Sequence, residues 1–154
     1  MWRLLVLAAA LAGVAADDDA SKKDLKAMQG HWKLQSFTLD GEVAPPDDVK
    51  AMRVVVEGNK WKMVSGKPNH PVKPGSGRRS QDDAETVTIT LDAAKKPAAI
   101  DFMDAKRKEK NEGIYQLGDD TLKVCFNMKK GRPVKFASKK GSEAVLLILQ
   151  RDKK

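Results

Sequence analysis

The short stretch around Gly30 and Trp32 constrains the fold of this chain more than any other. Leu25 and Met28 have the spacing of one face of a helical turn, and Gly30 can end that turn. Polar and apolar side chains then alternate over residues 31–39, as they do in a half-buried strand, and apolar residues on the second face predict a bulge or a covering loop near its end. We therefore expect the Trp32 ring to point inward from the first strand and to close one end of a β-barrel.

The rest of the chain has the pattern of short strands joined by tight turns. Gly58-Asn59 is a two-residue hairpin turn, and Gly118 begins another turn before two aspartates. The last strand is apolar on both faces, so both faces should be covered. Strands are expected at residues 31–39, 52–57, 60–64, 86–91, 98–103, 113–117, 121–127 and 144–151. About eight antiparallel strands in hairpin order, without a long helical pattern, predict an all-β up-and-down barrel with a short N-terminal helical turn.

The N-terminus has the features of a secretory signal peptide. Arg3 is followed by an apolar run and by small residues that end at Ala16. The apolar run is too short for a permanent membrane anchor, which needs about 20 apolar residues. The chain of 154 residues is otherwise long enough for one domain. We expect an exported protein, periplasmic or extracellular, with a signal peptide (1–16), a flexible arm (17–24) and a barrel domain (25–151).

The chain is basic, with a formal net charge of +8. The excess lies in three predicted loops, residues 67–79, 106–110 and 129–140, and the first belongs to a long segment rich in glycine and proline, residues 65–83. Basic loops attract polyanions, so an anionic cell-envelope polymer or an acidic protein is one class of partner, although loops are also charged for solvation alone. Lys73, Arg78 and Arg79 would carry such binding. A nucleic-acid partner is not expected, because the basic runs lack interleaved aromatic residues.

The residues of catalytic and metal sites are not found at useful spacings. His31 and His70 are the two histidines, and Cys125 is the single cysteine, so neither a zinc motif nor an intrachain disulfide is predicted. Cys125 has the context of a small apolar strand residue. The aspartate pairs occur at predicted turns, where aspartate bonds to the backbone: 47–48, 82–83 and 119–120. We predict a protein without enzymatic activity, catalytic residues, metal or cofactor.

A ligand pocket is the positive functional prediction. Apolar side chains from several strands, together with a few polar groups, are what a site for a small hydrophobic or amphipathic molecule requires. The predicted lining residues are Trp61, Phe102, Tyr115, Ser36 and Met63. The same side chains could instead fill a solid core, and the sequence leaves both readings open.

Gly30, Trp32 and Arg151 together resemble the signature of lipocalins, a glycine and a tryptophan two residues apart after a short helical turn. The resemblance implies that Trp32 closes the base of a barrel and that Arg151, from the last strand, packs across it. More specifically, the chain resembles a lipocalin-like domain family of unknown function found in exported planctomycete proteins. The similar segments are residues 28–32, 40–41, 57–60, 95–101, 113–117, 119–126, 132–133 and 145–149, with Pro45 and Phe136. That family implies the fold and export but no catalytic or binding residue, and residues 65–83 are longer than its usual loop.

Overall fold

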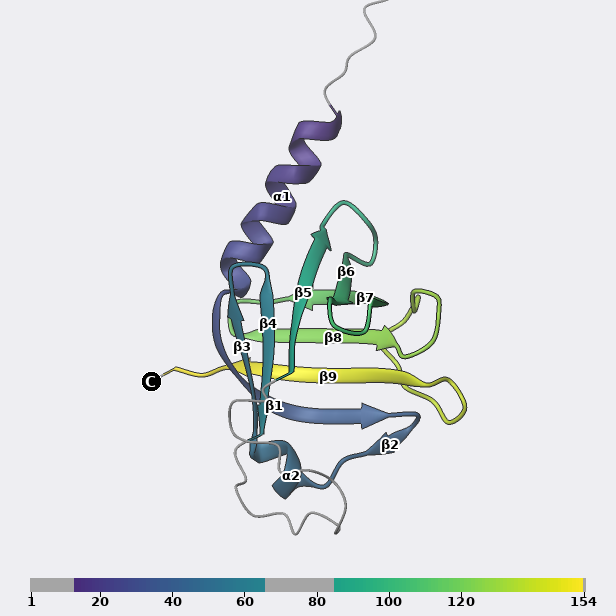
Figure 1. Cartoon of the computed structure of the whole chain (residues 1–154). Coiled ribbons are helices and arrows are strands. Elements are labelled where there is room, and N and C mark those ends of the chain that lie inside the picture. The colour runs from purple at the N-terminus through teal and green to yellow at the C-terminus, as the bar shows by residue number, and fades with distance from the viewer. Residues whose placement is uncertain (1–12, 66–84, 154) are drawn as a thin grey trace, which may run out of the picture.

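The chain folds into a closed antiparallel β-barrel with one helix at its N-terminal side (Figure 1). The computed structural model describes residues 13–65 and 85–153. Strands pair in the order β1-β3-β4-β5-β6-β7-β8-β9, and β9 pairs again with β1, which closes the barrel; β2 adds to β1 only. The bounds are α1 Gly13–Met28, β1 Gly30–Leu39, β2 Glu42–Val43, α2 Pro46–Lys50, β3 Met52–Glu57, β4 Lys60–Ser65, β5 Glu85–Asp92, β6 Ala99–Asp104, β7 Glu109–Leu117, β8 Thr121–Asn127 and β9 Ala144–Arg151. The predicted eight-stranded antiparallel barrel is confirmed.

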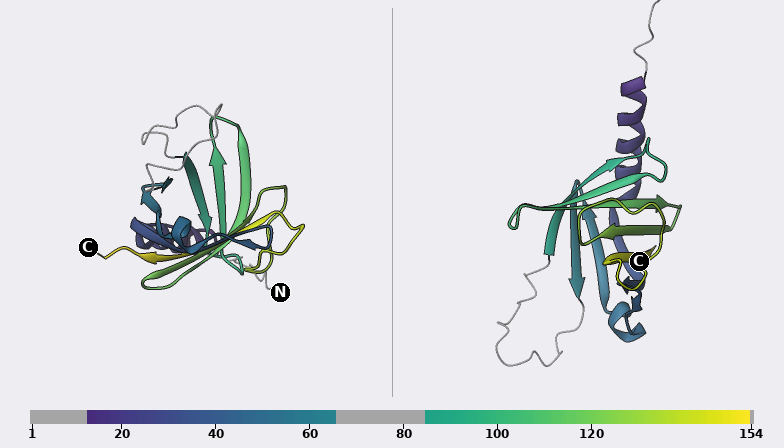
Figure 2. Two further views of the ribbon diagram at one scale, coloured as in Figure 1. Left: turned by 90° about the horizontal axis from the view of Figure 1, so that it is seen from below. Right: turned by 90° about the vertical axis from the view of Figure 1, so that its right-hand side faces the viewer.

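The two ends of the barrel differ in their connections. Because neighbouring strands are antiparallel, the start of β1, the end of β9 and the tight turns at 58–59, 93–98 and 118–120 lie at one end, which we call the Trp32 end. The other end, which we call the loop end, holds the connection at 40–51, the facing ends of β4 and β5, the turn at 105–108 and residues 128–143. Figures 1 and 2 show the helix α1 at the Trp32 end and α2 at the loop end.

The barrel interior holds one continuous apolar core. Residues paired directly across antiparallel strands project to the same face, so the strand registers identify the inward side chains. Every barrel strand contributes a side chain that is at most 3% exposed: Leu34, Val56, Trp61, Ile89, Ile100, Tyr115, Leu122 and Leu149. Burial of this apolar surface is the main force that holds the barrel closed.

The N-terminal helix is longer than the sequence pattern predicts. We expected a flexible arm and then one helical turn from Asp24, but α1 begins at Gly13. Its exposed face carries an ion pair of 2.6 Å between Lys22 and Asp18, one turn apart, which supports a helix. Its other face is tied to the barrel, because the Ala93 backbone N–H donates to Ser21 Oγ at 3.0 Å. The N-terminal half of α1 extends away from the barrel (Figure 2).

The predicted bulge lies in β1 and reverses the facing of the residues that follow it. Between Leu34 and Ser36 the pairing with β9 shifts by one residue, so that Gln35 is the extra residue. After the shift Phe37 pairs with inward Leu147, and Ser36 pairs with Ile148 on the outer face. The prediction that Ser36 faces the interior is therefore wrong, because it assumed an unbroken alternation along β1.

A covering segment, residues 128–143, crosses the outer face of the barrel; we call it the strap. Ala99, Ile114 and Cys125 are paired across β6, β7 and β8 on this outer face, yet each is at most 2% exposed. The Cys125 Sγ lies 3.6 Å from the Ala137 carbonyl in the strap, and burial raises the pKa of the thiol. Cys125 is thus a buried strand residue, as predicted, inside a second, smaller apolar layer.

Arg132 anchors the strap to β6 and β7. Asp101 and Glu112 are directly opposite each other on the outer face, an arrangement that is unfavourable for two carboxylates unless cations lie between them. Arg132 Nη2 is 2.8 Å from Asp101 Oδ1, and Arg132 Nη1 donates to the Gly113 carbonyl at 2.6 Å. Lys110 Nζ lies 3.2 Å from the second Asp101 oxygen. The two carboxylates are therefore part of an ion-pair network that holds the strap.

Candidate ligand-binding site

The Trp32 end is closed by its own side chains. Trp32 is fully buried, and its Nε1 donates a hydrogen bond of 2.9 Å to the Met28 carbonyl at the end of α1. The guanidinium of Arg151 lies 4.3 Å from the centre of the Trp32 ring, and its Nη1 donates to the Gln29 carbonyl at 3.0 Å. Arg151 thus joins the last strand to the helix and covers the ring, the arrangement that the resemblance implied.

Gly30 makes the tight passage from α1 into β1 possible. Its φ of +112° lies in a region that residues with a Cβ rarely adopt. Gln29, the residue before it, accepts a hydrogen bond from the Gly58 N–H at 2.7 Å and donates one to the Gly58 carbonyl at 2.8 Å. These contacts join the helix end to the hairpin turn at 58–59.

An aromatic cluster crosses the barrel interior. The Trp61 and Phe102 rings are 5.4 Å apart at 83°, and the Phe102 and Phe126 rings are 5.1 Å apart at 50°. Trp61 and Phe102 are buried, at 3% and 6% exposure, whereas Phe126 is half-buried. The cluster is thus solvent-free on its Trp61 side and reaches solvent on its Phe126 side.

The interior facing the loop end carries apolar side chains that remain half-buried. They pack against the core while keeping part of their surface accessible: Phe37, Met52, Met63, Val87 and Phe126. Four different parts of the barrel wall contribute them, namely β1, the β3–β4 hairpin, β5 and β8. Apolar surface that faces inward and is still accessible is what an apolar ligand can cover.

Four of the five predicted pocket residues face the barrel interior, and the fifth does not. Trp61 and Phe102 contact each other in the interior, and Met63 faces the same interior from β4. Ser36 lies on the outer face. Tyr115 also faces inward, paired with Val124 near the Trp32 end, and its hydroxyl reaches α1, where it donates to Asp24 Oδ2 at 2.7 Å.

Tyr115 is held in its neutral form by this environment. Burial of the side chain, followed by the hydrogen bond to the Asp24 carboxylate, raises the pKa of Tyr115 far above its ordinary value of 10.0. In the unfolded chain the phenol releases its proton near pH 10, whereas in the folded protein it keeps it. The stabilisation that depends on the neutral phenol is therefore complete below about pH 10 and decreases as the pH rises above it.

Replacing Tyr115 with phenylalanine is expected to remove this alkaline dependence. Above about pH 10 the wild-type free energy of unfolding should fall by about 1.4 kcal/mol per pH unit more than that of Tyr115→Phe. At neutral pH the variant should be less stable by about 0.5–1.5 kcal/mol, because the hydrogen bond to Asp24 is lost. Urea unfolding of both proteins at a series of pH values measures the difference, and parallel pH profiles would contradict this account.

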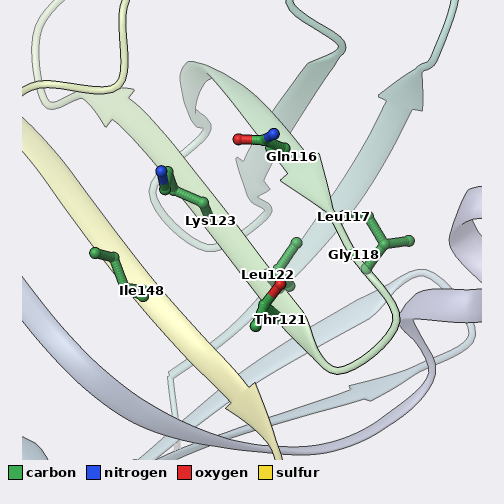
Figure 3. A pocket seen from close by; sticks show the side chains of 7 residues that line it. All are labelled: Gln116, Leu117, Gly118, Thr121, Leu122, Lys123 and Ile148. Atoms are coloured by element: carbon green, nitrogen blue, oxygen red, sulfur yellow. The ribbon is translucent and has the colours of Figure 1, made fainter.

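A larger hollow lies on the outside, next to Tyr115. It encloses about 420 Å³ and is lined by Asp24, Lys95, Lys96, Pro97, Ala98, Tyr115, Gln116, Leu117 and Phe136. A smaller one of about 200 Å³ shares Gln116 and Leu117 with it and continues along the outer face of the barrel to Lys123 and Ile148 (Figure 3). Sequence reasoning missed both, and the larger one depends on Phe136, which reaches this place only through the course of the strap.

The other residues considered for chemistry are dispersed or engaged in ion pairs. His31 is exposed on β1, and His70 lies outside the described residues. Of the aspartate pairs, 82–83 also lies outside them, while Asp120 is 2.7 Å from the Lys153 ammonium. Within residues 13–65 and 85–153, no three histidine, cysteine, aspartate or glutamate side chains are grouped as a metal site would require.

The fold and this geometry define the protein as a small eight-stranded antiparallel barrel with an apolar interior. No family model and no curated protein sequence matches the chain. Among solved structures, a mutant of the fluorescent protein UnaG is similar, with a TM-score of 0.41 and 14% identity over 84% of this chain and 99% of that one. A similarity of this size supports no inference about function. In the part of the chain that the structure describes, no helix has the length and apolar character needed to cross a membrane.

Proposed function

We propose that this protein is an exported, non-enzymatic barrel that binds a small hydrophobic or amphipathic molecule in its interior at the loop end. One observation carries the proposal: the apolar side chains that face inward there, Met52, Met63 and Phe126 among them, are half-buried, whereas the opposite end is closed by Trp32 and Arg151. A ligand would therefore enter at the loop end and would contact apolar side chains inside the barrel.

The residue types at the loop end suit a ligand of irregular shape. Met52 and Met63 have flexible, polarizable side chains that adapt to different molecules. Phe126, in contact with Phe102, offers a ring face or edge to an aromatic or conjugated ligand. Each square ångström of apolar surface covered contributes about 25 cal/mol, so covering these half-buried side chains favours binding without any ion pair.

A lysine at position 63 tests the proposal. The dye N-phenyl-1-naphthylamine is neutral and apolar, and its fluorescence rises when it leaves water. We expect saturable binding to the wild-type protein and at least about tenfold weaker binding to Met63→Lys, because an ammonium at the site must stay hydrated. Met103→Lys is the matched control, since Met103 lies on β6 with its side chain 41% exposed on the outer face.

Two outcomes of the dye titration would contradict the proposal. If the wild-type protein does not bind the dye saturably, or if Met63→Lys and Met103→Lys bind it equally well, the interior is not the site. Thermal unfolding of both variants shows that each is folded at the temperature of the titration.

A second candidate is a cationic surface that docks an anionic cell-envelope polymer or an acidic protein. It is favoured by the lysines of the loop-end turn and the strap, several of which make no ion pair with any described residue: Lys106, Lys108, Lys130, Lys135, Lys139 and Lys140. Lys73, Arg78 and Arg79 belong to this candidate too, but lie outside the described residues. Ionic strength separates the two candidates, because added salt weakens polyanion binding and leaves binding of the neutral dye unchanged.

A further inference from the structure

The larger outer hollow combines an apolar wall with free cationic groups. Phe136, Pro97 and Leu117 form apolar surface on separate elements, the strap, the turn at 93–98 and the end of β7. Lys95 and Lys96 lie at the same hollow. Its volume of about 420 Å³ is within the range of about 300–1,000 Å³ that small-molecule sites occupy.

The two ammonium groups are available to a ligand. Lys95 Nζ is 3.9 Å from Asp92 Oδ2, a long separation for an ion pair, with both side chains about half exposed. Lys96 is exposed and makes no ion pair with any residue in the described part of the chain. The opposing charge in the lining is Asp24, and one of its oxygens already accepts the Tyr115 hydrogen bond at 2.7 Å. Charge complementarity therefore favours an anion.

The walls of the hollow are held in place by the fold. Phe136 lies over the Lys123 ammonium, 5.6 Å from Nζ to the ring centre, in the strap that Arg132 fixes to the Gly113 carbonyl at 2.6 Å. On the opposite side, Tyr115 and Asp24 join β7 to α1. A site whose walls are already in place loses less conformational entropy on binding than one that must be ordered.

We infer that this hollow is a second binding site, for a small organic anion with an apolar chain or ring. Its carboxylate or other anionic group contacts Lys95 and Lys96, and its apolar part lies on Phe136, Pro97 and Leu117. The smaller hollow that shares Leu117 continues this surface to Ile148 (Figure 3), so the site accommodates a chain that extends along the outer face. The inference does not depend on ligand binding in the barrel interior.

Decanoate, below the concentration at which it forms micelles, is a suitable probe, with decanol and acetate as its apolar and anionic halves. We expect calorimetric titration of the full chain to show decanoate binding that is weakened about fivefold or more in a Lys95→Gln, Lys96→Gln double variant. Phe136→Ala should weaken it as well. Backbone amide shifts on titration should be concentrated at residues 94–98, 115–118 and 136.

A double variant that loses two lysines away from the hollow is the control for the loss of charge. Lys50→Gln with Lys60→Gln removes the same charge at the end of α2 and the start of β4, where both residues are exposed, and should leave decanoate affinity within twofold of wild type. Equal weakening in the two double variants, or amide shifts located in the barrel interior, would overturn the inference. So would acetate binding as tightly as decanoate, since that indicates simple charge attraction. Failure of the dye to bind the interior would leave all of these outcomes unchanged.

Discussion

Replacing Trp32 with alanine is expected to lower the free energy of unfolding by about 3–5 kcal/mol, the largest effect that we predict for one substitution. The ring is fully buried between α1 and the barrel, so its removal leaves a cavity that the surrounding strands cannot refill. It also leaves Arg151 without the ring that it covers at 4.3 Å. Urea unfolding followed by far-UV circular dichroism measures the loss without relying on tryptophan fluorescence.

Two variants separate packing at this position from the hydrogen bond. Trp32→Phe keeps an aromatic ring but removes the Nε1 donor to the Met28 carbonyl, and we expect a smaller loss than for alanine. His31→Ala changes the exposed neighbour on the same strand and should remain within about 0.5 kcal/mol of wild type. If Trp32→Ala is no less stable than His31→Ala, the ring does not close the barrel.

Replacing Arg151 with methionine is expected to cost about 2–4 kcal/mol, because one side chain makes several contacts that methionine cannot replace. Its Nη2 donates to the Ala27 carbonyl at 2.6 Å and its Nη1 to the Gln29 carbonyl at 3.0 Å. These carbonyls lie at the C-terminal end of α1, where a positive charge is favourable. Thermal and urea unfolding measure the loss of stability. The backbone amides of α1 should also exchange their hydrogens with solvent faster in the variant than in the wild type.

Lysine at position 151 should restore little of this stability, because an ammonium cannot stack on Trp32 and reach both carbonyls as a planar guanidinium does. Lys153→Met is the control: it removes a cation of the same terminal segment that pairs with Asp120 at 2.7 Å but is 69% exposed. A surface pair of this kind contributes little. Equal losses in Arg151→Met and Lys153→Met would indicate a general charge effect in place of the specific contacts.

The strand pattern of the sequence was sufficient to predict the barrel. The Gly58-Asn59 turn and the alternation around Trp61 and Met63 set the register of the β3–β4 hairpin, in which Trp61 pairs with Val56 and Met63 with Val54. Such information is local, since a two-residue turn and a period of two determine which side chains share a face. The wrong facing of Ser36 shows the limit, because the bulge at Gln35 depends on pairing with β9, more than a hundred residues away.

The candidate sites were less predictable than the fold. Tyr115 faces the interior as expected, but the hydrogen bond from its hydroxyl to Asp24 was not predicted, because the full length of α1 was not predicted. Phe136 and Lys96 are 40 residues apart in sequence and line one hollow only because the strap folds back over the outer face of the barrel. Local sequence patterns do not predict that the strap crosses the barrel. Arg132 fixes the strap there through contacts with two strands.

The sequence by itself determined the class of fold and the closure at Trp32, because these depend on side-chain alternation, turn residues and a few large side chains near each other along the chain. The tertiary structure alone decided which apolar side chains stay half-buried at the opposite end of the interior and which surface combines lysines with apolar side chains. Both depend on long-range packing of the strap and α1 against the barrel. The stretch around Gly30 and Trp32 thus identifies the closed end, and the candidate sites lie in the interior at the opposite end and on the outer face next to α1.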